Sequence, residues 1–168
     1  VSDLQAEWLF SGNLIDSSVN ANNFTTSSNY TYENDRDAVA TSALGLGTSS
    51  TMQDPSTEFN ITDDMSVSFW IYFNAISVYS GIFEWVQAGV NQTFCYMSPD
   101  SLLYYQIVQT DPFSYINVNT TEKITTGWTH VVVTFDSPST LAIYINGVES
   151  TISVNQAGSV AWGNMTGA

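Results

Sequence analysis

Six Asn-x-Thr triplets are the residues of this chain with the clearest chemistry. The asparagine of such a triplet accepts an N-linked glycan, a bulky and solubilising group carried on exposed chain in secretory and cell-surface compartments. With 14 Asn and 19 Thr in 168 residues, chance would give roughly one or two triplets. Asn-x-Ser does not occur, although Ser is at least as common as Thr. We therefore expect covalent glycans at Asn23, Asn29, Asn60, Asn91, Asn119 and Asn164; the alternative is accidental scatter in an organism that does not N-glycosylate.

The charge balance favours the same extracellular or cell-surface location. Arg36 and Lys123 are the only basic side chains of the sequence, against sixteen carboxylates, and the net charge is −14. Nucleic acids and anionic lipid surfaces are bound through Lys and Arg, so both are excluded as partners. Charged residues make up only 11% of the chain. Its solubility must therefore come from Ser, Thr, Asn and sugar.

Cysteine use and hydropathy exclude two further classes of protein. Cys95 is the single cysteine, so the chain has no internal disulfide, and its apolar neighbours predict a buried thiol that acts as a small hydrophobe. No apolar run reaches the roughly 18 residues that span a bilayer, so we expect no membrane insertion. The chain opens without Met at Val1, as a processed mature chain would.

Apolar residues alternate with polar ones along several segments, which predicts β-strands. Residues 66–73 place Val67, Phe69, Ile71 and Phe73 on one face, and residues 130–135 do the same with alternate apolar side chains. Residues 141–145 run into Asn146-Gly147 and then into 148–154, and Asn-Gly between alternating runs indicates a hairpin. Further strands are predicted at 102–108 and 115–118.

The spacing of these segments indicates one all-β domain. Little helix is expected, and residues 19–37 and 48–57 read as long loops. Many short strands separated by Ser, Asn, Gly and Pro are typical of a sandwich or jelly roll of two antiparallel sheets. We see no repeat or linker, and therefore predict a single domain over residues 1–168.

The same alternation divides the aromatic residues between the core and the surface. Trp70, Tyr72 and Tyr144 point away from the predicted core, and one of the neighbours Tyr104 and Tyr105 must do so as well. Outward rings can stack on a bound sugar, cover the protein's own glycans, bury against another subunit or pack under loops. These alternatives stay open at the level of sequence.

Three stretches resemble the laminin-G-like, concanavalin-A-like jelly-roll family. Residues 8–18 resemble its aromatic-Phe-x-Gly-Asn-x-x-Asp-Ser-Ser start, and residues 42–47 with 65–71 are similar to its Ala-Leu-x-Phe-x-Gly and Phe-Thr-x-x-Trp-Val segments. Residues 126–135 and 141–147 resemble its Gly-Trp-x-His-Val-Ala-Val-Thr-Tyr and Leu-Tyr-Val-Asn-Gly pair. The resemblance implies two packed antiparallel sheets in a sugar-binding, adhesive or structural module, and by itself it names no function.

Neither catalysis nor metal binding has a diagnostic pattern. The Glu-x-Asp-x-Glu spacing of glucanases on this fold is absent, and His130 is the only histidine, so we assign no catalytic residue and expect no enzymatic activity. Calcium is an alternative cofactor, because hard cations prefer oxygen ligands. Its candidate ligands have no diagnostic spacing, so no metal residue is assigned; they are Asp16, Asp35, Asp37, Asp63 and Asp64.

The end of the chain departs from the family pattern. Only 14 residues follow Val154, with one short strand expected at 160–163, so the closing strand of the family looks absent. A sheet without its last strand exposes unpaired backbone that another chain can cover. Residues 1–6 are either a donor to a neighbour or an ordinary terminal strand. We therefore expect copies of the chain as partners in a filament or surface layer; the alternative is a lectin-like carbohydrate-binding adhesion module.

Overall fold

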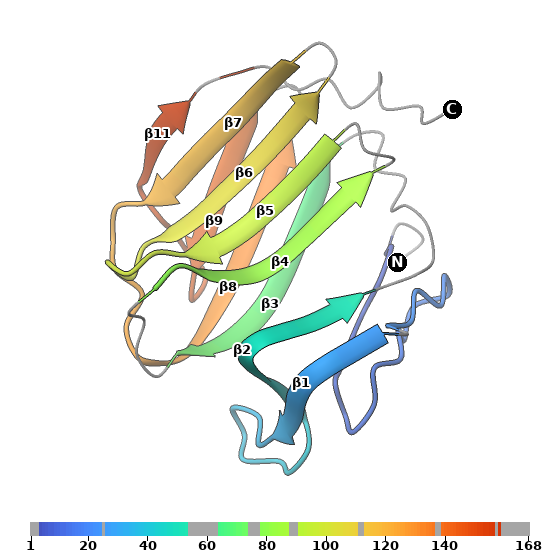
Figure 1. Ribbon diagram of the computed structural model, residues 1–168. Helices are drawn as coiled ribbons and strands as arrows, with labels where there is room; N and C mark the ends of the chain where they lie inside the picture. The colour runs from blue at the N-terminus through green and yellow to red at the C-terminus, as the bar shows by residue number, and fades with distance from the viewer. Residues whose placement is uncertain are drawn as a thin grey trace. The chain divides into compact units, whose positions relative to one another are not determined.

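The structure is a computed structural model that describes residues 4–24, 26–53, 64–73, 78–87, 91–110, 113–136, 139–156 and 158. Every secondary-structure element over these residues is a β-strand, as the alternation predicts. A membrane-spanning helix is accordingly not found among them. Two compact units divide the chain, Val1–Phe59 and Asn60–Ala168 (Figure 1). The expectation of a single domain over 1–168 stays a prediction.

The first unit contains an antiparallel strand pair. β1 (Thr26–Glu33) pairs with β2 (Ala43–Gln53), and the register shifts between Ser28 and Tyr30. The prediction of long loops at 19–37 and 48–57 is therefore wrong over these strands. Their Ser, Gly and Asn content looks like loop sequence, but Thr and Tyr favour the pleated backbone, and one of them occurs in five of the seven cross-strand pairs.

The segment before β1 folds back on itself around Asp16. Trp8 and Asp16 form an antiparallel bridge, and the Trp8 ring packs on Phe24 with ring centroids 4.7 Å apart. The Trp8 indole N–H donates to the carbonyl of Asn22 over 2.9 Å. Asn20 donates from Nδ2 to the carbonyl of Leu4 over 3.0 Å. These bonds hold the start of the described chain within its own unit.

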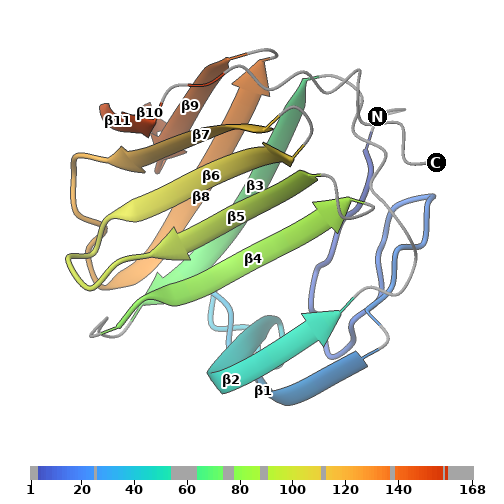
Figure 2. The same cartoon turned by 45° about the horizontal axis from the view of Figure 1, so that its top comes forward.

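The second unit is a sandwich of two antiparallel sheets, which Figures 1 and 2 show packed face to face. One sheet has the order β10-β9-β8-β3 and the other β11-β7-β6-β5-β4. The strands are β3 (Met65–Phe73), β4 (Ser80–Gln87), β5 (Asn91–Met97), β6 (Leu103–Thr110), β7 (Phe113–Thr120), β8 (Gly127–Asp136), β9 (Thr140–Ile145), β10 (Val148–Glu149) and β11 (Ile152–Gln156).

The core lies between these sheets and follows the predicted alternation. Val131, Val133 and Phe135 of β8 are buried, and alternate residues of β3 from Val67 to Phe73 pack against them. Phe69 of β3 meets Phe83 of β4 edge to face, with centroids 5.7 Å apart, so the contact joins the two sheets. Cys95 is buried in this core, as predicted.

The Asn-Gly hairpin is confirmed, but the strand after it differs from the prediction. Asn146 and Gly147 adopt φ values of 51° and 81°, the left-handed conformation that this tight turn needs. The predicted single strand 148–154 is wrong, because β10 ends at Glu149 and β11 joins the opposite sheet beside β7. Ser150 donates its N–H to the Ile143 carbonyl, and Thr151 accepts from Thr121, so the chain crosses between sheets at these two residues.

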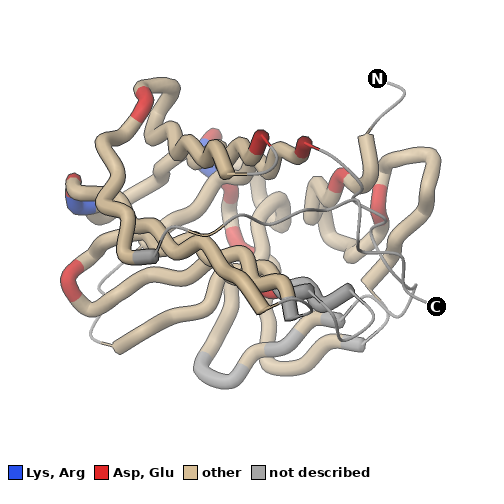
Figure 3. The backbone as a smooth tube through the Cα atoms, turned by 90° about the horizontal axis from the view of Figure 1, so that it is seen from above, with Lys and Arg blue, Asp and Glu red and all other residues tan. Residues whose placement is uncertain are grey.

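Only part of the C-terminal segment, for which a missing closing strand was predicted, lies within the described residues. β11 occupies an outer position of the five-stranded sheet, where it pairs with β7. The short strand expected at 160–163 lies outside the described residues. Figure 3 shows acidic positions spread along the backbone, with few basic ones among them.

Candidate functional site

An aromatic surface covers the outward side of the four-stranded sheet. We call it the aromatic face and define it as Trp70, Tyr72, Trp128, His130 and Tyr144. Trp70 and Tyr72 keep 43% and 52% of their surface exposed. The outward positions predicted for Trp70, Tyr72 and Tyr144 are thus consistent with the structure, in which the intervening residues of their strands face the core.

Antiparallel register brings these rings together from residues that are far apart in the sequence. Trp70 lies directly opposite His130, and Tyr72 lies opposite Trp128. Directly opposed residues share one side of the sheet, so each pair meets on the outer surface. The Trp70 and His130 rings lie 4.9 Å apart and are tilted by 31°, and Tyr72 and Trp128 meet at 5.5 Å edge to face. The resulting surface is continuous over two strands.

Hydrogen bonds fix the position of His130 within this surface. Its Nε2 shares a hydrogen bond of 2.9 Å with the Ser68 hydroxyl. Its backbone N–H donates to Asn146 Oδ1 over 2.9 Å, and the Asn146 N–H donates back to the His130 carbonyl over 2.9 Å. The hairpin turn is therefore tied to β8 beside the Trp70–His130 pair. This arrangement holds the rings in one orientation before any ligand binds.

Polar groups border the aromatic face and can hydrogen-bond a ligand. Ser68 lies next to Trp70 along β3, and Asn146 lies beyond His130 in the hairpin turn. Glu149 of β10 is paired with Tyr144 of β9 and is exposed. Hydroxyl, amide and carboxylate groups around exposed rings are the combination that recognises a ligand with both hydroxyl groups and an apolar side.

A second group of rings lies on the outward side of the five-stranded sheet. Tyr96 and Tyr104 stack with centroids 5.0 Å apart and only 12° between their planes, and Tyr79 packs on Tyr96 at 6.0 Å. Tyr96 and Tyr104 are only half-exposed, whereas Trp70 and Tyr72 are exposed. Tyr105 is fully buried, so Tyr104 is the outward member of this pair. We therefore regard the aromatic face on the other sheet as the better platform for stacking.

The predicted glycan acceptors occupy different environments. Asn29 is exposed, while Asn23 is half-buried and accepts a hydrogen bond at Oδ1 from the Asp16 N–H. Asn91 begins β5, but its side chain lies outside the described part of the structure. Asn60 and Asn164 also lie outside it. Glycosylation of any of these residues stays a prediction.

Asn119 differs from the exposed position expected of an acceptor, because only 7% of its surface is exposed. Its Nδ2 donates to the Thr120 carbonyl over 2.8 Å. Asn155 of β11 donates to Asn119 Oδ1 over 2.9 Å and to Asn117 Oδ1 over 2.8 Å. A glycan is too bulky for this covered position in the folded sheet. The sequence predicted a strand at 115–118 with Asn119 at its end, and it carried no sign that β11 covers this residue.

Two of the aspartates considered for calcium, Asp16 and Asp35, already accept several hydrogen bonds within the chain. Asp16 accepts from the N–H groups of Glu7, Ser18 and Asn22 over 2.7–2.8 Å, and from the Ser18 hydroxyl over 2.6 Å. Asp35 accepts from the N–H groups of Asp37 and Val39. Within the described residues, no three His, Cys, Asp or Glu side chains are grouped so that they could hold a metal. Asp63 lies outside them.

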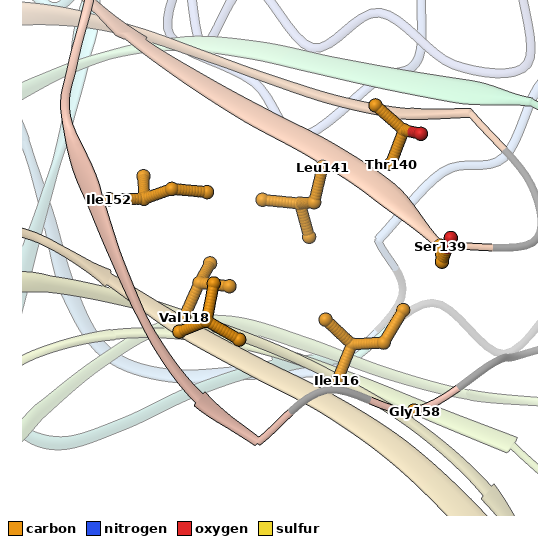
Figure 4. Close-up of a pocket in the computed structure, with 8 residues that line it drawn as sticks. Ile116, Val118, Ser139, Thr140, Leu141, Ile152 and Gly158 are labelled. Carbon is orange, nitrogen blue, oxygen red and sulfur yellow. The ribbon is translucent and has the colours of Figure 1, made fainter.

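An apolar groove opens along one side of the sandwich, between the β9 and β11 strands. It has a volume of about 400 Å³. Figure 4 shows Leu141 and Ile152 pointing toward each other across it, with Ile116 and Val118 below and Ser139 and Thr140 at its end. Beside it, β9 pairs with β8 along its whole length, whereas β10 pairs only with Ile145 and Tyr144. Among the described strands, the other edge of β9 is therefore uncovered next to the groove.

Comparison with known families agrees with this architecture. A laminin G family model, described as the concanavalin A-like lectin/glucanases superfamily, matches residues 46–167. The chain therefore belongs to the concanavalin A-like lectin/glucanase superfamily and carries a laminin-G-like domain, as the sequence motifs indicated. Domains of this type are typically extracellular and can bind carbohydrate. No curated protein matches the chain.

Proposed function

We propose that this chain is an extracellular, non-catalytic adhesion module that binds carbohydrate on its aromatic face. The observation that carries the proposal is the exposure of Trp70 and Tyr72 on a sheet surface whose rings are already oriented by His130 and Trp128. The apolar side of a pyranose ring stacks on an aromatic face, while its hydroxyl groups need hydrogen-bond partners. Ser68, Asn146 and Glu149 offer those partners.

The net charge of the chain limits which sugars the aromatic face can bind. A net charge of −14 repels sulfated and uronic polysaccharides, and only Arg36 and Lys123 could offset it. Glu149 adds a negative charge next to Tyr144. We therefore expect a neutral or amino sugar as the ligand.

Binding to an array of neutral, amino and anionic glycans tests this function. Trp70→Ala and Tyr72→Ala should each weaken binding roughly tenfold, because stacking contacts contribute on the order of 1 kcal/mol beyond buried area. Phe113→Ala is the matched control, since that ring is 71% exposed at the start of β7 on the other sheet. Equal affinities for all variants, or no glycan bound above background, would contradict the proposal.

We expect no reaction on the bound sugar. Ser68 and His130 are in hydrogen-bond contact, but the backbone N–H groups of β8, flanked on both sides, point within the sheet and cannot stabilise an oxyanion on its face. Glycoside hydrolysis needs two carboxylates that face each other across the sugar. β10 places one carboxylate, that of Glu149, beside Tyr144 of the aromatic face. Prolonged incubation with a bound oligosaccharide should leave its mass unchanged. Binding should also survive EDTA, because no three His, Cys, Asp or Glu side chains of the described residues are grouped to hold a metal ion.

A second candidate function is a self-assembling, N-glycosylated structural subunit of a filament or surface layer. The six acceptor triplets favour it, and so does the groove between β9 and β11. A strand from a second copy could pair with the uncovered edge of β9 and insert apolar side chains beside Leu141 and Ile152. The bonds from Asn20 to Leu4 favour keeping the start of the chain in its own unit over donating it.

Two measurements test the second candidate. Intact mass before and after enzymatic deglycosylation reports glycan occupancy, and a mass equal to that of the bare polypeptide would exclude the glycoprotein. Size measurement at micromolar concentration reports assembly. Leu141→Asp should abolish polymers that depend on the groove, whereas Val148→Asp should not, because that exposed residue lies outside the groove. A stable monomer would exclude self-assembly.

A further inference from the structure

Asn29 lies exposed in β1 at an irregularity of the β1–β2 pair, which makes it unlike the other acceptors with described side chains. The pairing of β1 with β2 shifts register between Ser28 and Tyr30, and Asn29 adopts φ 56° at that point. Its carbonyl accepts from the Ser50 hydroxyl, which fixes the irregularity. The extra residues of this irregularity are on β2, because Ser28 pairs with Thr51 and Tyr30 with Leu46, so residues 47–50 lie opposite Asn29 alone. Asn29 is exposed, whereas Asn23 is half-buried and Asn119 is buried.

Direct contact between copies is opposed by charge. Each chain carries −14 with two basic side chains, so two bare surfaces in contact bring like charges within the roughly 8 Å over which physiological salt screens them. An oligosaccharide held between two copies keeps the charged surfaces apart. It also brings hydroxyl groups and apolar ring faces, which the aromatic face can bind.

We propose that the aromatic face of one copy binds the N-linked glycan carried by Asn29 of a second copy, so that the chain associates with itself through sugar. This inference rests on the proposed carbohydrate-binding function and adds the source of the ligand. The two elements lie in different units of the same chain, Asn29 in the first and the aromatic face in the second. Each copy therefore supplies one ligand and one receptor, and association can continue from copy to copy.

A matched pair of substitutions at Thr31 tests the inference without touching the irregularity at Asn29. Thr31 is exposed and completes the acceptor triplet of Asn29. Thr31→Val removes the acceptor and keeps a β-branched side chain, whereas Thr31→Ser keeps a working acceptor. In protein from a host that N-glycosylates, sedimentation velocity should show self-association weakened at least tenfold by Thr31→Val and by Trp70→Ala. Thr31→Ser and Phe113→Ala should associate like the parent chain.

The same preparation separates failure of this inference from failure of the proposed function. Glycans released enzymatically from the protein should bind the deglycosylated chain and compete with self-association. If they bind but deglycosylated protein associates as tightly as before, the inference is overturned and carbohydrate binding stands. An unmodified Asn29 in peptide mass spectra also overturns the inference alone. If neither the released glycans nor any glycan on the array binds, the proposed function falls together with the inference.

Discussion

The Asp16 carboxylate should control the stability of the segment that precedes β1. Asp16→Ala leaves three backbone N–H groups, those of Glu7, Ser18 and Asn22, without their acceptor. These donors are partly accessible to water, so each loss costs roughly 1 kcal/mol and the total is roughly 3 kcal/mol. A loss of that size raises the population of the opened segment by about a hundredfold.

Hydrogen exchange read by mass spectrometry is the suitable assay, because peptides from residues 4–24 report this segment separately from the sandwich. Asp16→Ala should abolish protection there and leave the β8 peptides unchanged. Asp35→Ala is the control, since Asp35 accepts two N–H bonds in a more exposed turn between β1 and β2. Similar losses of local protection in the two variants would refute the reasoning from burial and bond number.

The pH dependence of exchange gives an independent check. Burial by itself raises the pKa of Asp16, but hydrogen bonds from Ser18, Glu7 and Asn22 outweigh it and hold the pKa below its ordinary value of 3.8. A carboxyl whose pKa is lowered by folding stabilises the folded state above its unfolded pKa, and this contribution disappears as pH falls through the folded value. Protection of residues 4–24 should therefore decline below about pH 4. Asp16→Ala should remove that decline.

Three further predictions concern the sandwich. Tyr105→Phe should raise the free energy of unfolding by about 1 kcal/mol in urea, because its buried hydroxyl has no hydrogen-bond partner among the described residues; a loss of stability would contradict this. Burial also raises the pKa of Cys95, so a thiol reagent at pH 8 should label it only after unfolding, and rapid native labelling would be the opposite result. Gly158→Ala should loosen the end of β11 in hydrogen exchange, because a Cβ there would lie 2.5 Å from the Tyr115 carbonyl oxygen. Gly81→Ala, where a Cβ meets nothing within 4 Å, should leave exchange unchanged.

The strands that sequence predicts well are those whose burial is one-sided. In β3 and β8 every second residue enters the core, so the alternation of apolar and polar side chains directly reports the fold. β1 and β2 were missed because large side chains alternate only briefly in them, at Tyr30 and Tyr32 and at Leu44 and Leu46, and the rest is mostly Ser, Thr and Gly. The break between β10 and β11 was missed for another reason. The sheet that β11 joins is decided by pairing with β7 and by the bond between Thr121 and Thr151, which lie 30 residues apart in sequence.

The features of the candidate site divide in the same way, into those set within one strand and those set by pairing between strands. Outward positions of Trp70, Tyr72 and Tyr144 could be predicted from one strand at a time. The pairing of Trp70 with His130 depends on the register between strands 60 residues apart, and no local pattern fixes that register. The covering of Asn119 by Asn155 likewise requires that β11 pair with β7. Site features made within a strand were therefore predictable, and those made between strands were not.

Because Asn119 is buried in the folded sheet, its modification would depend on the order in which the strands fold. Glycan transfer needs a freely accessible asparagine, which Asn119 offers only before Asn155 reaches it. If β11 pairs with β7 before the glycan-transferring enzyme acts, Asn119 should stay unmodified. A slow-folding variant should be modified and then be unable to dock β11. The fraction of molecules that carry sugar at this position would therefore measure how fast the last described strand joins its sheet, relative to the enzyme that competes for it.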